Sequence, residues 1–107
     1  MQTYPAKRIA IIIEAPLLSR LTNALDKSDV PGYTVVPVLG GSGRSGPWTR
    51  EGQVSRAGGM AMVIIIAEAD VAERVLEPIF AVVEPHIGVV TISDCEVLRK
   101  ERFSARK

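Results

Sequence analysis

The chain has 107 residues, of which 47% are hydrophobic, and 13 Lys and Arg against 12 Asp and Glu give a formal net charge of +1. This length suits one hydrophobic core and excludes a two-domain enzyme, so we expect residues 1–107 to form a single domain. The near-neutral charge argues against nucleic-acid binding, and one cysteine excludes an internal disulfide, which is consistent with a reducing, cytoplasmic setting.

The first predicted element is a strand at residues 9–13, where β-branched residues follow one another without polar alternation. Such a pattern is typical of a strand that is buried on both faces. The run is too short for an export signal, and Glu14 interrupts it. The apolar stretch 60–67 is far shorter than a bilayer requires, so we predict neither export nor a transmembrane segment.

A helix and a second strand follow. Leucines and alanines recur at helical spacing behind Pro16, which suits a first helical turn, and Pro31-Gly32 ends the helix. Residues 33–39 predict a strand that is rich in valine and contains Pro37. Because proline cannot donate to a ladder, this strand belongs at a sheet edge.

Residues 40–59 hold seven of the nine glycines and only one acidic residue. A structureless loop of this length is either functional or disordered. Within it, residues 40–46 combine unobstructed backbone N–H groups, serine hydroxyls and the Arg44 guanidinium, which are the parts of an anion or phosphate cradle. A flexible insertion without a ligand is the alternative, and composition alone does not separate the two.

Two nucleotide motifs are excluded in this loop. Residues 41–46 match G-x-G-x-x-G, but residues 47–50 show no helical periodicity, so the helix that a dinucleotide fingerprint needs is missing. No Lys-Ser or Lys-Thr pair follows a glycine, so the Walker A pattern fails as well. The single tryptophan, Trp48, either docks onto a partner or packs on its own domain.

A second strand-helix unit completes the chain. Residues 62–66 predict a strand, and apolar spacing over residues 70–80 predicts a helix with Asp70 as its N-cap. Pro78 is expected to kink or split this helix. After Gly88, residues 89–92 predict the last strand, followed by a short fifth strand or an ordered tail with the basic residues Arg99, Lys100 and Arg102.

The predicted order is β-α-β-β-α-β, an α+β, ferredoxin-like sandwich with both helices on one face of a four-stranded antiparallel sheet. The second strand is an edge in this arrangement, which agrees with Pro37. The two central strands are apolar on both faces, but the helices cover only one. We therefore expect the chain to self-associate through the uncovered face.

Three segments carry a resemblance to a known family. They are Lys7-Arg8-Ile9-Ala10-Ile11-Ile12-Ile13, then Gly32-Tyr33-Thr34-Val35 leading to Gly40-Gly41-Ser42-Gly43-Arg44, and His86-Ile87-Gly88-Val89-Val90 with Cys95-Glu96-Val97-Leu98. In order and spacing they resemble the PII signalling family over nearly the whole chain. The family consists of trimers of ferredoxin-like subunits, with a long T-loop between the second and third strands and nucleotides held between subunits.

The resemblance implies a regulator that binds ADP, AMP or cyclic AMP, together with bicarbonate, in clefts of a homotrimer, and that signals inorganic-carbon or energy status through the T-loop at residues 40–59. It implies the following nucleotide-binding residues: Thr34, Gly40, Gly41, Ser42, Gly43, Arg44, Ile66, Gly88, Val89, Arg99 and Arg102. Bicarbonate would contact Gly41, Ser42 and Arg44, with Arg56 as a further candidate. Trp48 and Arg50 would face a partner protein.

The sequence departs from the nitrogen regulators of that family. Its loop has no tyrosine, and Glu101 stands at the second position of the C-terminal basic pair, beside the displaced Arg102. Glu14 and the Gly-Ser-Arg loop base are more similar to the bicarbonate-linked, PII-like proteins. That branch includes a carboxysome-associated group and the partner of a cyanobacterial bicarbonate transporter, so proteins of these kinds are candidate partners.

Three other functions are alternatives to this one. The main alternative is an oligomeric interaction adaptor whose loop binds a protein and no small molecule. A metal-responsive protein is disfavoured because one His, one Cys and three Met make a poor ligand set, so we predict no metal site. We predict no enzyme, because His86 is expected to be buried or capping, Cys95 to be inert, and no catalytic base is identified.

Overall fold

The structure is a computed structural model that describes residues 1–43, 46–49, 59–86 and 88–103. Its elements are β1 (Tyr4–Glu14), the 3₁₀ turn η1 (Ala15–Leu17), α1 (Leu18–Asp26), β2 (Thr34–Val38), β3 (Gly40–Gly43), β4 (Gly46–Thr49), β5 (Met60–Ala67), α2 (Ala69–Val83), β6 (Gly88–Val97) and the 3₁₀ turn η3 (Lys100–Arg102). None of the helices in the described ranges has the length and apolarity that crossing a bilayer requires.

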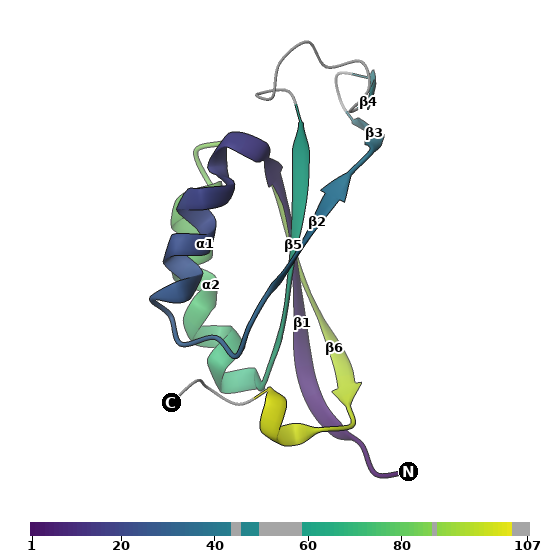
Figure 1. The fold of residues 1–107 in the computed structure, drawn as a ribbon, viewed down its shortest axis with the longest axis vertical. Coiled ribbons are helices and arrows are strands. Elements are labelled where there is room, and N and C mark those ends of the chain that lie inside the picture. Colours follow the sequence, from purple (N-terminus) through teal and green to yellow (C-terminus); the bar gives the residue numbers. More distant parts are fainter. Residues whose placement is uncertain (44–45, 50–58, 87, 104–107) are drawn as a thin grey trace.

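The main sheet is antiparallel, with the strand order β2-β5-β1-β6. Both helices lie on one side of it (Figure 1). This confirms the predicted α+β, ferredoxin-like arrangement. It also confirms that the strand with Pro37 lies at an edge, where the missing N–H leaves the ladder to β5 intact.

The core lies between the helices and one face of the two central strands. Ile9, Ile11 and Ile13 of β1 are completely buried, and so are Val63 and Ile65 of β5. They pack against Leu21, Leu25, Val75 and Ile79 of the two helices. Each such side chain contributes roughly 1.5–3 kcal/mol through burial, so this face accounts for much of the stability of the fold.

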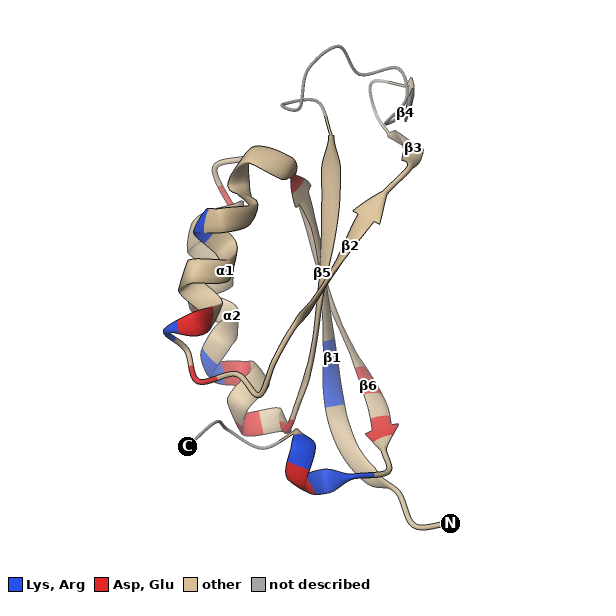
Figure 2. Cartoon of the chain, in the orientation of Figure 1, with Lys and Arg blue, Asp and Glu red and all other residues tan. Residues whose placement is uncertain are grey.

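The opposite face of the sheet is uncovered in the single chain. Burial along β5 alternates strictly, and Met62, Ile64 and Ile66 remain half-buried, as does Ile12 of β1. Burial of the central strands on both faces is therefore wrong for one chain, because its helices cover only one face. β2 and β5 carry no charged residue, and Figure 2 shows charges concentrated towards the η3 end of the sheet.

Both helices begin differently from the prediction. Pro16 lies in η1, and α1 starts only at Leu18. In α2 the N-cap position is Glu68, which makes no side-chain cap hydrogen bond, and Asp70 lies within the first turn. Asp70 as N-cap is therefore wrong, although its carboxylate suits the positive end of the helix dipole.

Pro78 does not split α2, which is continuous from Ala69 to Val83. A proline removes one hydrogen bond, here to the carbonyl of Arg74, and its ring crowds the preceding turn. The neighbouring Val75 and Ile79 are completely buried against the sheet. This packing outweighs the local cost of the proline and keeps the helix in one piece.

β6 is longer than predicted and continues through a polar stretch to Val97. It does so because it pairs with β1 over its whole length, from Gly88 opposite Ile13 to Val97 opposite Tyr4. An ion pair between Lys7 and Asp94 adds to this ladder. The chain then forms η3, so the ordered tail is confirmed and a fifth strand is not formed within the described part of the tail.

The loop at residues 40–59 is not wholly structureless. β3 and β4 form a two-stranded antiparallel hairpin beyond the end of β2 (Figure 1), with Gly41 opposite Trp48. The end of the loop is fixed as well, because the Ala15 N–H donates to the Gly59 carbonyl at 2.8 Å. The predicted site residues Arg44, Arg50 and Arg56 lie outside the described residues.

Candidate functional site

The tail and the two neighbouring strands β2 and β5 enclose a cavity of about 290 Å³. Its lining residues are Pro31, Gly32, Tyr33, Thr34, Ile64, Ile66, Arg102 and Phe103. Thr34 pairs with Ile64 across the ladder, and Ile66 follows two residues later, so the three side chains share one face. The cavity thus brings together Thr34, Ile66 and Arg102, which are far apart in the sequence and were all predicted as nucleotide-binding residues.

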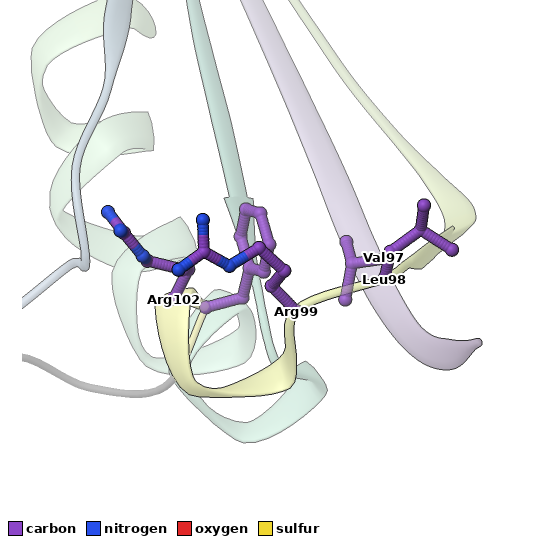
Figure 3. A pocket seen from close by; sticks show the side chains of 5 residues that line it. Val97, Leu98, Arg99 and Arg102 are labelled. Carbon is purple, nitrogen blue, oxygen red and sulfur yellow. The ribbon is translucent and has the colours of Figure 1, made fainter. Parts of the chain in front are cut away.

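A second cavity, of about 450 Å³, adjoins the tail. It is lined by Val97, Leu98, Arg99, Arg102 and Phe103 (Figure 3). Figure 3 shows Val97 and Leu98 on one side and the two arginine side chains extending from the η3 turn. Because Arg102 and Phe103 line both cavities, the two hollows are neighbours, and a guanidinium group lies at their boundary.

Hydrogen bonds hold the tail in this position. The Glu68 N–H at the start of α2 donates to the Phe103 carbonyl at 2.9 Å, and the Arg102 N–H donates to the Arg99 carbonyl at 3.0 Å. The Lys100 ammonium lies 5.9 Å from the centre of the Tyr4 ring, which turns it away from the arginine cavity. Arg99 and Arg102 are thus presented from an ordered turn.

The two arginines differ in their partners. The Arg99 Nε lies 3.6 Å from the Glu101 carboxylate, in a pair whose side chains are 64% and 71% exposed. Arg102 makes no ion pair within the part of the chain that the structure describes. A planar guanidinium without a carboxylate partner is well suited to bind the oxygens of a phosphate in a bidentate manner.

The other predicted residues lie at the opposite end of the sheet. Gly40, Gly41, Ser42 and Gly43 form the exposed strand β3, and Gly88 and Val89 begin β6. Gly88 is required by packing: a Cβ atom there would lie 2.9 Å from Val83 Cγ1 and 3.1 Å from the Ile12 carbonyl oxygen. The absence of a side chain lets the backbone of this turn lie directly on β1 and α2.

The predicted residues thus form two groups that do not meet within one chain. Gly88 pairs with Ile13 of β1, whereas Ile66 pairs with Arg8, earlier in the same strand. These positions are five residues apart along an extended strand, which corresponds to about 17 Å. Hydrogen bonds to a phosphate reach only about 3 Å, so no single phosphate contacts both ends of the sheet in one chain.

A third cavity, of about 520 Å³, lies beside the first residues of β1 and α2, and its polar lining includes Lys7, Glu68, Asp94, Cys95 and Lys100. In the described residues no three His, Cys, Asp or Glu side chains are grouped as a metal site would require. His86 is exposed, so burial, one of its two predicted roles, is wrong; its backbone N–H donates to the Val83 carbonyl at 2.9 Å, at the end of α2. Cys95 is a half-buried free thiol.

Several lining residues were missed in the sequence analysis, among them Ile64 and Phe103. Ile64 lies on the same strand face as Ile66, so the alternation of β5 was a sufficient signal. Phe103 lines all three cavities. The only indication of this role in the sequence was an aromatic residue directly after a basic cluster. Its position depends on the hydrogen bond to Glu68, which no pattern in the sequence indicates.

Comparisons with known proteins agree with this fold. The model of the family named nitrogen regulatory protein P-II matches residues 6–102. A comparison with curated protein sequences gives no match. A structure of CPII, a nitrogen regulatory PII-like protein from Thiomonas intermedia K12, bound to ADP, AMP and bicarbonate, is 30% identical with a TM-score of 0.84, and the alignment covers 96% of this chain and 97% of that chain.

Two further structures are similar. CPII bound to ADP and bicarbonate is 32% identical with a TM-score of 0.79, covering 95% of this chain and 97% of the other. A PII-like signalling protein from Thermus thermophilus is 26% identical with a TM-score of 0.76, covering 96% of this chain and 99% of the other. The likeness therefore extends over nearly the full length of each chain.

Proposed function

Because this chain belongs to the nitrogen regulatory protein P-II family, we propose that it is a regulatory protein, not an enzyme, that binds ADP or AMP together with bicarbonate. The nucleotide is held between subunits of a homotrimer, and its presence is reported through the T-loop at residues 40–59. Cyclic AMP is a further candidate nucleotide. The regulated partner is a bicarbonate transporter or a carboxysome-related protein.

One observation carries this proposal: the cavity that joins Thr34, Ile66 and Arg102. The hydroxyl of Thr34 supplies a hydrogen-bond donor and acceptor, and the backbone of Ile66 faces the edge of the adenine. The Arg102 guanidinium neutralises phosphate charge. The CPII structures bound to ADP support this choice of ligand class, because they are similar to this chain along its whole length.

The site is completed by a second copy. In one chain the glycine-rich group at Gly40 and Gly88 lies about 17 Å from the Ile66 group along the strands. In a closed ring of copies, the end of the sheet that carries Gly40 and Gly88 in one subunit meets the end that carries Arg102 in its neighbour. Backbone N–H groups of Gly88 and Val89 from one copy, and of Gly41 and Ser42 beside Arg44, then surround the phosphates and bicarbonate.

The uncharged, half-buried face of β2 and β5 supports such a ring. A contiguous apolar sheet face is uncommon on a monomer, and a second copy of the same chain buries it. Association through this face is therefore the first step, and nucleotide binding depends on it.

Signalling follows from the loop. The anion orders part of the T-loop, which then presents Trp48 and Arg50 to the partner. Ordering costs about 1 kcal/mol or more per residue, so a small ligand fixes only part of the loop. Bicarbonate acts at Gly41, Ser42, Arg44 and Arg56, beside the nucleotide.

Isothermal titration calorimetry with ADP and AMP, with and without bicarbonate, tests the proposal. We expect saturable binding by the wild-type protein and a loss of about tenfold or more on Arg102→Ala, because hydrogen bonds to a charged group contribute about 1.5–3 kcal/mol. Arg20→Ala, on the exposed surface of α1, is the control and leaves affinity unchanged. Absence of heat with every nucleotide contradicts the proposal.

The adaptor alternative is separated by Arg44→Ala. Under the proposed function this variant loses nucleotide binding and, with it, ligand-dependent capture of the partner. If the variant and the wild type capture the same partner equally well, and neither binds a nucleotide, the adaptor function holds instead.

A further inference from the structure

Arg8 and Glu14 lie on the uncovered face of the main sheet, towards opposite ends of β1. The completely buried isoleucines of this strand alternate with them, so both charged residues belong to the face that the helices leave open. Their partners in β5 agree, because Arg8 lies opposite Ile66 and Glu14 opposite Met60, and both belong to the half-buried set of that strand. β1 therefore contributes one charge of each sign to this face.

Neither residue has a partner of opposite charge in its own chain. Within the described residues, no ion pair and no side-chain hydrogen bond involves Arg8 or Glu14. The cross-strand neighbours of Arg8 are Ile66 and Ser93, which carry no charge. Arg8 and Glu14 are six residues apart along an extended strand, about 20 Å, so they do not pair with each other in one chain.

Closing the sheet face against another copy makes an unpaired Arg8 costly. In the single chain Arg8 and Glu14 are only half-buried, so water still reaches both charges. A charge that is removed from water without a partner is strongly unfavourable, whereas an opposite charge with good geometry offsets much of the penalty. Because the chain itself offers Arg8 no anion, the partner has to come from another copy, and Glu14 lies on the same face.

The two ends of β1 match the proposed ring. Glu14 directly follows Ile13, which pairs with Gly88. Arg8 pairs with Ile66, which lines the cavity of about 290 Å³. In the ring, the end of the sheet with Gly88 in one copy meets the end with Ile66 in the next. The same arrangement brings the carboxylate of Glu14 towards the guanidinium of Arg8.

We infer that Arg8 of each copy forms an ion pair with Glu14 of the next copy, and that this pair sets the register in which the copies close. The inference rests on the proposed function, because it uses the same ring and names the residues that align it. Such a head-to-tail contact repeats until the ring closes, so every copy contributes one arginine and one glutamate. An apolar face alone resists sliding weakly, whereas a buried polar pair at one position specifies one register.

Charge reversal tests the pair by sedimentation velocity. Arg8→Glu and Glu14→Arg each place like charges opposite one another, so the concentration needed for half-assembly is expected to rise about tenfold or more. The double variant, Arg8→Glu with Glu14→Arg, again has opposite charges and is expected to recover most of the assembly. Binding of ADP, measured by calorimetry, is expected to be lost and recovered together with it.

Matched controls reverse the same charges on the helical layer. Arg20→Glu on α1 and Glu77→Arg on α2 change exposed residues and are expected to assemble as the wild type does. Circular dichroism verifies that each variant is folded. If a reversal does not fold, Arg8→Gln and Glu14→Gln replace it, and the loss in their double variant is expected to be smaller than the product of the two single losses.

The outcomes separate the two proposals. A wild-type protein that remains a single chain overturns the proposed ring and the inference with it. If the wild type assembles, but the folded reversal variants assemble equally well or the double variant recovers nothing, only the inference is overturned. Independent losses in the glutamine variants overturn it as well. A wild-type ring that binds no nucleotide contradicts only the proposed ligand, and recovery in the double variant then still supports the pair.

Discussion

At the scale of single residues, Gly88 connects the fold to the site. Its backbone lies against Val83 and Ile12 so closely that no side chain fits, and it begins the strand whose first residues are proposed to face the phosphates. Pattern analysis identified Gly88 as a chain break and, through the family resemblance, as a binding residue. The packing reason for glycine was not predictable, because it depends on the return of α2 to β1.

Replacing Gly88 by alanine is expected to destabilise the fold by about 1–3 kcal/mol, because the new methyl group overlaps Val83 Cγ1 and the Ile12 carbonyl. This corresponds to a fall of several degrees in the melting temperature, which differential scanning calorimetry measures. Gly32→Ala is the matched control, since nothing lies within 4 Å of a Cβ atom there. Equal melting temperatures for the two variants would contradict the packing argument.

At the scale of elements, the tail is the part that sequence patterns described least well. Its basic residues were visible, but the pattern did not distinguish a short fifth strand from an ordered tail. The position of the tail is set by the hydrogen bond from the Glu68 N–H to the Phe103 carbonyl, and Phe103 lines a cavity together with Ile64 and Ile66 of β5. In contrast, both helices and the edge position of β2 were predicted, because apolar periodicity and Pro37 act locally.

The Phe103 side chain is expected to affect ligand affinity, because it holds the tail in place. Phe103→Ala removes the side chain shared by all three cavities, so Arg99 and Arg102 must be ordered when the nucleotide binds. At about 1 kcal/mol per residue ordered, affinity for ADP is expected to fall about tenfold or more in calorimetric titrations. Phe80→Ala, which truncates an aromatic ring 57% exposed on α2, is the control and binds as the wild type does. Unchanged affinity in Phe103→Ala would show that the tail needs no anchor.

At the scale of the whole molecule, the uncovered sheet face explains why one chain holds only parts of a site. The apolar character of both central strands indicated this face, but it did not show that the two groups of site residues lie at opposite ends of the sheet. That separation follows from the register of β1 with β5 and β6. Register is set by pairing across the whole sheet and is not encoded in any single segment.

Met62 lies on this face, opposite Ile12 and Val36 and outside the three described cavities. Met62→Arg is expected to dissociate the oligomer and abolish nucleotide binding together, because a charge buried between copies without a partner is strongly unfavourable. Size-exclusion chromatography with light scattering measures the first effect and calorimetry the second. Phe80→Arg, which adds the same charge on the helical layer, should alter neither.

In the proposed assembly, the exposed apolar sheet faces of several copies close against one another, and each ligand site is formed by two chains. Sedimentation velocity of the wild-type protein at micromolar concentration tests it most directly. We expect a species of three times the 11.5 kDa chain mass. A compact single chain that persists at this concentration and still binds ADP would contradict it.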